Sequence, residues 1–142
     1  MPSDTFSHTA KVGATPESVA AALQVAATWK GIGPIDDVWD ATHEGSDLTA
    51  FRWSAHAAGK SWEGTATRSE DHNPDSMTLD LDSSEIAGAL TVSYAPDEGG
   101  TALTVDLFVR SKGILAGMFW GVVADALRKG LPSQIEGFGS QF

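Results

Sequence analysis

The chain has 142 residues, of which 42% are hydrophobic and 20% are charged, and these values are typical of one folded domain rather than of a disordered segment. Its formal net charge of -10 argues against a nucleic-acid partner, because phosphate binding requires clustered lysine and arginine. The absence of cysteine excludes disulfides, thiolate metal sites and a cysteine nucleophile, and it fits a cytoplasmic location. We therefore expect a single soluble domain spanning residues 1–142.

The first segment is expected to form a strand followed by a helix. The strand is indicated by alternate positions that share one face: Phe6, His8, Ala10 and Val12. Thr15-Pro16-Glu17 then opens a helix, since it offers an N-cap side chain, a proline at the first helical position and an acidic first turn. An apolar stripe at Val19, Leu23 and Ala26 predicts that this helix continues until the glycines at 31 and 33.

Six further strands are predicted between Ile35 and Arg110. They are separated by short segments rich in the residues that turns require. The expected ranges are residues 36–43, 48–57, 60–70, 76–82, 89–95 and 101–110. Because the connections are short, consecutive strands should be antiparallel neighbours.

A long helix is predicted from Gly113 onward. It carries two apolar rows, one at Leu115, Phe119, Val123, Leu127 and Leu131, the other at Ile114, Met118, Val122 and Ala126. Pro132 should kink or restart it. Gly113, Gly117 and Gly121 form a strip beside Trp120, for which we expect close packing on the sheet, with a dimer contact as the alternative. The uncharged stretch 113–124 is 12 residues long, shorter than the roughly 20 that a membrane span needs.

With its elements in this order, the chain resembles the SRPBCC superfamily, also called START-like or Bet v 1-like, and within it the polyketide cyclase/dehydrase type. The resemblance is carried by the stretches 12–19, 100–105, 111–117 and 130–142. It implies an α+β helix-grip fold, with a seven-stranded antiparallel sheet curved around a long C-terminal helix and a cavity between them. Members include lipid carriers, hormone and flavonoid binders, aromatic cyclases, co-chaperones and accessory proteins of carbon monoxide dehydrogenase, so the fold alone fixes no activity.

Apolar and aromatic side chains are the candidates for the wall of such a pocket. They are Trp39, Phe51, Trp53, Trp62, Leu79, Leu81, Tyr94, Met118, Phe119 and Val122. Small-molecule sites are usually concave and apolar with a few polar groups. Plain core packing is the alternative for each residue, since aromatic side chains bury large areas. The resemblance favours a partly hollow core.

Three polar residues are candidates for chemistry in that pocket. His8 lies on an apolar strand face, as an acid or base or as an ordinary core histidine. Arg68 shares its parity with Trp62 and either holds a carboxylate or enolate or faces outward; Tyr94 is the third candidate. No two histidines have zinc-ligand spacing, and we expect no metal and no cofactor.

Three functions remain open from the sequence. The leading hypothesis is binding or transport of a hydrophobic small molecule such as a lipid, quinone, polyketide or aromatic metabolite. The second is a cyclase or dehydratase that moves protons by general acid–base catalysis and needs converging polar groups, for example His8 with Arg68 or Tyr94. The third is a co-chaperone or maturation factor that uses an outer surface near Trp120. The protein is expected to be a monomer or homodimer without a membrane span.

Overall fold

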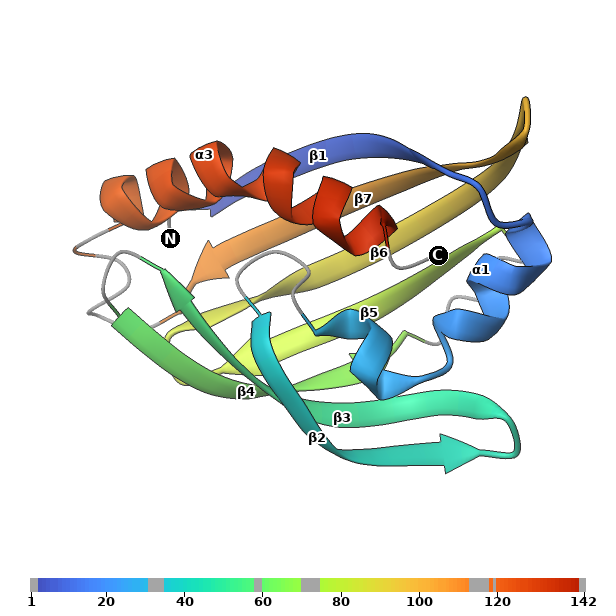
Figure 1. The fold of residues 1–142 in the computed structure, drawn as a ribbon. Helices are drawn as coiled ribbons and strands as arrows, with labels where there is room; N and C mark the ends of the chain where they lie inside the picture. Colours follow the sequence, from blue (N-terminus) through green and yellow to red (C-terminus); the bar gives the residue numbers. More distant parts are fainter. Residues whose placement is uncertain are drawn as a thin grey trace.

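The computed structural model describes residues 3–30, 35–57, 60–69, 75–112, 118 and 120–140. In chain order the elements are β1 (Ser3–Val12), α1 (Pro16–Ala22), the 3-10 helix η1 (Ala26–Trp29), β2 (Ile35–Glu44), β3 (Asp47–Ala57), β4 (Lys60–Arg68), β5 (Ser76–Ser83), β6 (Ile86–Asp97), β7 (Gly100–Ser111) and α3 (Trp120–Gly139). Every strand lies within a few residues of the range predicted for it. Figure 1 shows α3 running along one side of the sheet and α1 at one of its ends.

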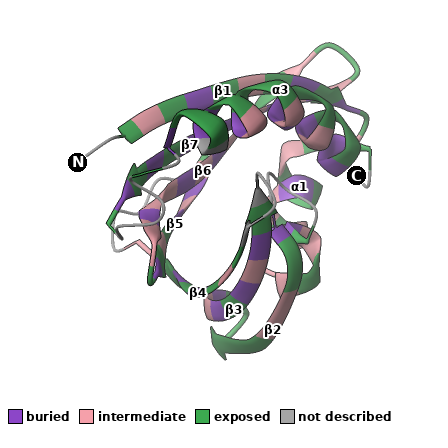
Figure 2. Cartoon of the chain, turned by 90° about the vertical axis from the view of Figure 1, so that its left-hand side faces the viewer, coloured by how far each residue is buried: buried purple, intermediate pink, exposed green. Residues whose placement is uncertain are grey.

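The strands form one seven-stranded sheet in the order β1-β7-β6-β5-β4-β3-β2, and each neighbouring pair is antiparallel. Consecutive strands from β2 to β7 are joined as hairpins, and β1 closes the order by pairing with β7. Figure 2 shows the sheet bent so that the edge strands β1 and β2 stand on opposite sides of the molecule. The α+β helix-grip fold expected from the sequence is thereby confirmed.

One face of the sheet is buried and the other is largely exposed, which follows from the alternation of side chains along each strand. In β7 the buried positions are Thr101, Leu103, Val105, Leu107, Val109 and Ser111. In β5 Met77 and Leu79 are buried, whereas Asp80 and Asp82 are exposed on the opposite face. These acidic residues therefore belong to the solvated, convex side.

The first helix is shorter than its apolar stripe predicted. Thr15 caps it as expected, with its hydroxyl oxygen accepting from the Ser18 N–H at 3.2 Å, but α1 ends at Ala22. Val25 adopts an extended conformation (φ -104°, ψ 120°), so the chain restarts as η1. The reason is tertiary: the indole of Trp29 is fully buried and donates to the carbonyl oxygen of Leu23 at 2.9 Å, which requires the chain to turn back under α1.

The C-terminal helix buries the described part of the first predicted row, whereas most of the described second row is exposed. Its buried side chains are Trp120, Ala124, Leu127, Leu131, Ile135 and Phe138, so Leu127 and Leu131 lie inward as predicted. At about 100° per residue, Met118 and Val122 of the second row lie roughly 160° around the helix from Trp120, and they are 70% and 57% exposed. A strict four-residue row drifts around a helix of 3.6 residues per turn, which is why the second row packs against the core at Ala126 but faces solvent at Val122 and Met118.

The structure also bears on Pro132 and on the glycine strip of this helix. The helix continues through Pro132, so of the two expected effects of this proline, a kink or a restart, the restart does not occur. Gly121 does not pack closely on the sheet, because a Cβ placed there would have nothing within 4 Å. Gly113 and Gly117 lie outside the described residues.

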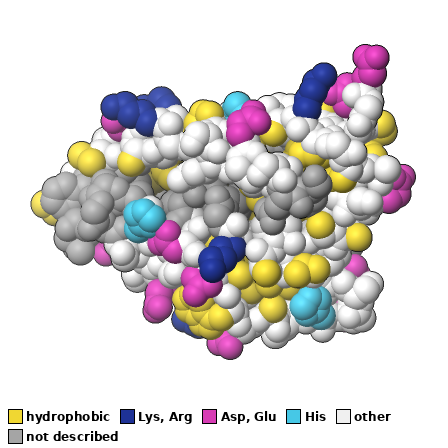
Figure 3. All heavy atoms as spheres, in the orientation of Figure 1, with side chains coloured by type: hydrophobic (Ala, Val, Ile, Leu, Met, Phe, Trp, Pro, Cys, Tyr) yellow, Lys and Arg dark blue, Asp and Glu magenta, His cyan; other side chains and the backbone are white. Residues whose placement is uncertain are grey.

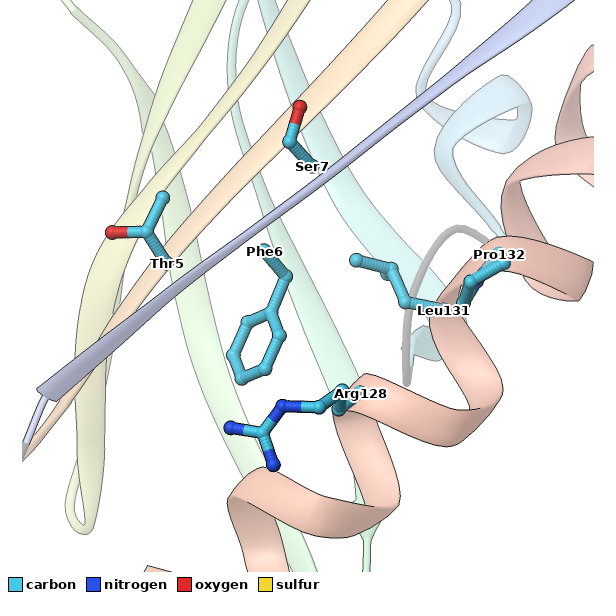
Figure 4. Close-up of a pocket in the computed structure, with 6 residues that line it drawn as sticks. All are labelled: Thr5, Phe6, Ser7, Arg128, Leu131 and Pro132. Atoms are coloured by element: carbon cyan, nitrogen blue, oxygen red, sulfur yellow. The ribbon is translucent and has the colours of Figure 1, made fainter.

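Side-chain contacts hold α3 along β1. The Trp120 indole N–H donates to Oδ2 of Asp4 at 3.0 Å, and the guanidinium carbon of Arg128 lies 5.9 Å from the centre of the Phe6 ring (Figure 4). Thr5, Phe6, Ser7, Arg128, Leu131 and Pro132 line an open groove of about 310 Å³ at this seam. The groove runs beside the outer edge of β1, and it is separate from the concave face of β3–β5.

Candidate functional site

The concave face of β3, β4 and β5 gathers most of the apolar residues that the sequence proposed for a pocket. Phe51 and Trp53 of β3 are buried, as is Leu79 of β5. Residues directly opposite in an antiparallel pair share a face. The pairs Phe51 with Ala66 and Ala66 with Leu81 therefore place all three side chains on one surface.

Part of this inward surface is not covered. Trp62 and Leu81 pack against the core yet are only partly buried. The helix α3 rests mainly on β1, with smaller contacts to β3 and β7. The neighbours of Trp62 and Leu81 on the same face of β3 and β4 are small residues, namely Ala55, Gly64 and Ala66. Trp62 and Leu81 therefore project above an apolar surface and remain accessible.

Gly64 sets the position of the Trp53 indole. The two residues are directly paired across β3 and β4. A Cβ on Gly64 would lie 2.6 Å from Cζ2 and 2.9 Å from Cε2 of Trp53, and 2.2 Å from the carbonyl oxygen of Asp82. The indole therefore lies over the glycine, with Cζ2 and Cε2, the carbon bonded to Nε1, closest to it. An isolated glycine inside a strand pattern often marks such a close approach, and this signal was present in the sequence.

The Trp53 indole nitrogen is a buried donor without an acceptor. Trp53 is 5% exposed, and its Nε1 has no hydrogen-bond partner among the residues that the structure describes. The other fully engaged indoles differ: Trp29 donates to Leu23 and Trp120 donates to Asp4. Leaving a buried N–H unpaired costs about 1–3 kcal/mol, so this nitrogen stands out.

Arg68 lies on the same face at the α1 end of the sheet. Its side chain is 19% exposed, and Nη1 lies 3.4 Å from Oε1 of Gln24 and 3.7 Å from Oδ1 of Asp47. Gln24 is held by the backbone N–H of Leu48, which donates to the same Oε1 at 2.8 Å. Both contacts of the guanidinium are long, so Arg68 keeps capacity to bind an anionic group. Gln24 and Asp47 were not singled out from the sequence, because the turn after α1 brings Gln24 to Arg68 and the pairing of β3 with β4 brings Asp47 there.

Tyr94 is near Arg68 at this end. It faces inward, opposite Leu103 on β7, and is partly buried against the core. It also lines an open hollow of about 240 Å³ with Pro16, Glu17, Ala20, Asp75 and Pro96. Burial raises the pKa of the Tyr94 phenol above its ordinary value of 10.0, the Asp75 carboxylate raises it further, and the Arg68 charge lowers it in part.

The alkaline titration of Tyr94 can be checked directly, because it is the only tyrosine in the chain. We expect its absorbance titration to have a higher midpoint in the folded protein than in guanidinium. Since the folded state holds the phenolic proton more tightly, stability should fall as the pH rises above about 10. Tyr94→Phe removes the absorbance change and serves as the blank. A folded midpoint at or below the unfolded one would contradict the burial described for this side chain.

His8 lies apart from Arg68 and Tyr94. It shares the inward face of β1 with Phe6 and Ala10, as predicted, but its Nε2 is 2.8 Å from Oε1 of Glu136 on α3. Between β1 and β4 stand β7, β6 and β5. The pairing of His8 with Arg68 considered from the sequence therefore does not form, and His8 ties the helix to the edge strand.

Three pocket candidates are corrected by the structure. Trp39 pairs with Arg52, whose side chain is on the exposed face, whereas Val38 is the residue opposite Trp53. Trp39 therefore faces outward, as its partner Arg52 does. Met118 and Val122 are on the exposed side of α3, as shown above, and do not line the concave face. Phe119 lies outside the described residues.

Comparisons with known proteins agree with this architecture. No protein-family model matches the sequence, and no curated protein matches it significantly. A START superfamily protein from Mycobacterium smegmatis is 18% identical over 96% of this chain and 97% of that chain, with a TM-score of 0.72. The ZhuI aromatase/cyclase of Streptomyces sp. R1128 is 16% identical over 99% and 95% of the two chains, with a TM-score of 0.68. The major latex-like protein 151 of Panax ginseng is 10% identical over 89% and 96%, with a TM-score of 0.55.

At sequence identities this low, the similarity to these structures shows a shared fold and nothing further. The chain has the START-like, SRPBCC helix-grip fold, which it shares with a START superfamily protein and with an aromatase/cyclase. Among the described helices, none is long and apolar enough to cross a bilayer. Within the described ranges, no three His, Asp or Glu side chains gather as metal ligands do.

Proposed function

We propose that this protein binds, and in doing so carries, a hydrophobic small molecule on the concave face of β3–β5. Lipids, quinones, polyketides and aromatic metabolites are the chemical classes that such a surface fits. The observation that carries the proposal is the partial exposure of Trp62 and Leu81, two apolar side chains whose positions face inward. Accessible apolar surface inside a curved sheet is the usual lining of a small-molecule site.

Arg68 gives this site one charged end. The side chain of Arg68 is four-fifths buried, and among the described residues its guanidinium has long contacts to Gln24 and Asp47. A carboxylate, sulfonate or enolate placed there would gain charge-assisted hydrogen bonds. An apolar molecule with one acidic end is therefore favoured over its neutral counterpart.

The test uses two fluorescent probes that differ by one acidic group. These are 1-anilinonaphthalene-8-sulfonate and N-phenyl-1-naphthylamine, which lacks the sulfonate. Both should bind saturably, and Arg68→Met should weaken the sulfonate probe about tenfold, as loss of a charged hydrogen bond does, while leaving the neutral probe unchanged. Arg52→Met is the matched control, because Arg52 lies on the exposed face of the neighbouring strand. Absence of saturable binding by either probe would overturn the proposal.

A cyclase or dehydratase is the second candidate. It is supported by Arg68 and Tyr94, since the Arg68 charge acts on the Tyr94 phenol at the same end of the sheet. General acid–base catalysis requires such neighbouring polar groups. Native mass spectrometry of the protein from its own host distinguishes the two functions: a carrier returns its ligand unaltered on incubation, whereas an enzyme converts it.

The third function, a co-chaperone or maturation factor, would use another part of the outer surface than Trp120. The Trp120 side chain is 8% exposed, packed against β1 and hydrogen-bonded to Asp4, so it is not itself available to a protein partner. In Figure 3 basic side chains are interspersed with acidic ones on the visible face. The lack of a nucleic-acid partner, the monomeric or dimeric state, the single domain and the cytoplasmic location stay predictions within this proposal.

A further inference from the structure

The unpaired indole N–H of Trp53 is a second polar group in the proposed site, besides the Arg68 guanidinium. Its Nε1 is closed off from water, and the carbonyl groups near it belong to the paired strands β3, β4 and β5. By strand pairing, the described inward-facing residues around Trp53 are apolar or small: Val38, Phe51, Ala55, Trp62, Gly64, Ala66, Leu81 and Ser83, whose hydroxyl is already hydrogen-bonded to the backbone of Ile86. Neither the described residues nor bulk solvent therefore supplies the acceptor that a buried indole N–H normally has.

The surroundings also restrict what kind of acceptor can satisfy this nitrogen. Moving an anion into an apolar environment without a partner cation is far more costly than moving a neutral oxygen there. Arg68 is four residues along β4 from Gly64, which is roughly 13 Å in an extended strand. An anion held by Arg68 is thus too far away to be the partner of Trp53, and a neutral carbonyl oxygen fits the site.

We propose that the bound molecule is an apolar compound with a neutral ketone, quinone or ester carbonyl, whose oxygen accepts a hydrogen bond from Trp53 Nε1. This inference rests on the proposed small-molecule function and narrows its ligand class. The carbonyl enters beside Trp62, which is adjacent to Trp53 on the same face and partly exposed. Entry displaces the side chains that cover the nitrogen, and it replaces an unpaired donor with a paired one.

The test compares two probes of nearly equal shape. 2-Acetylnaphthalene carries a carbonyl, and 2-isopropylnaphthalene has a methyl group in its place. The protein should bind the ketone about 3- to 10-fold more tightly, the ratio that one neutral hydrogen bond produces. Trp53→Phe, which keeps an aromatic ring but removes the N–H, should abolish this preference, so that the ketone and the hydrocarbon bind the variant with equal affinity.

Trp62→Phe is the matched control, because it alters an indole on the same face without touching the unpaired donor. The ketone preference should persist in it. A second measurement does not depend on any variant: in the protein labelled with ¹⁵N-tryptophan, the Trp53 indole N–H signal, assigned through its contacts with Gly64, should shift downfield with the ketone and not with the hydrocarbon.

The outcomes separate the inference from the function on which it rests. Equal binding of the two probes, or a ketone preference that survives Trp53→Phe, overturns the carbonyl assignment while small-molecule binding stands. If neither naphthalene nor the neutral N-phenyl-1-naphthylamine binds, the proposed function fails and this inference falls with it.

Discussion

Replacing Trp29 by alanine is expected to lower the free energy of unfolding by about 3–5 kcal/mol, the usual cost of truncating a buried aromatic side chain. Trp29 is fully buried, and its ring centre lies 6.5 Å from that of Phe51 and 6.3 Å from that of Phe138. It therefore joins η1 to β3 and to the end of α3. Chemical denaturation followed by circular dichroism measures the effect.

Trp29→Phe separates packing from hydrogen bonding in the same position. It keeps an aromatic ring but leaves the Leu23 carbonyl without the indole donor at 2.9 Å. We expect a smaller loss of about 1–2 kcal/mol. If Trp29→Ala lowers the free energy of unfolding no more than Trp29→Phe does, Trp29 does not connect η1, β3 and α3 as the structure describes.

Gly64→Ala is expected to destabilise the protein by about 1–3 kcal/mol, the range for overfilling a well-packed site. The added methyl group would lie 2.2 Å from the carbonyl oxygen of Asp82 and 2.6 Å from Trp53 Cζ2. Neither neighbour can move aside without a substantial energetic cost, because the Asp82 carbonyl belongs to the backbone and the Trp53 indole is rigid. The Trp53 ring must shift, so binding of the apolar probes should weaken as well.

Gly137→Ala is the control for this substitution. Gly137 is an exposed residue of α3, and a Cβ there would meet nothing within 4 Å. Alanine favours the helix over glycine, so this variant should gain up to about 1 kcal/mol and bind probes normally. A neutral effect of Gly64→Ala on both stability and binding would contradict the close approach of β3 and β4.

The strands were predictable from the sequence because their signals are local. Alternation such as that of Leu103, Val105 and Leu107, together with glycine at turns, gives the position of each strand. Gly45 and Gly99 indeed have φ values of 64° and 80°, which glycine adopts without strain. The helix-grip arrangement then followed from the resemblance, and short connections gave the antiparallel order.

The candidate site was less predictable from the sequence, because it depends on how neighbouring strands pair and on which side of α3 faces the sheet. Phe51, Trp53 and Leu79 were placed on the inward face correctly by parity within their own strands. Trp39 was not, since its direction depends on its partner in β3, and that partner is Arg52, which faces outward. For Met118 and Val122 the apolar pattern was present on more than one side of the helix, and only its docking on β1 selected which side is buried.

By itself, the sequence determined the order of strands and helices, the inward parity of most strands and the absence of thiol chemistry, because each of these depends on neighbouring residues or on composition. The tertiary structure decided that Trp29 is a core residue, that Gln24 reaches Arg68, that His8 faces Glu136 instead of a pocket, and that the Trp53 indole N–H has no acceptor among the described residues. These features depend on how segments distant in the chain approach one another. The curvature of the sheet and the rotation of α3 set those approaches, and no local pattern encodes them.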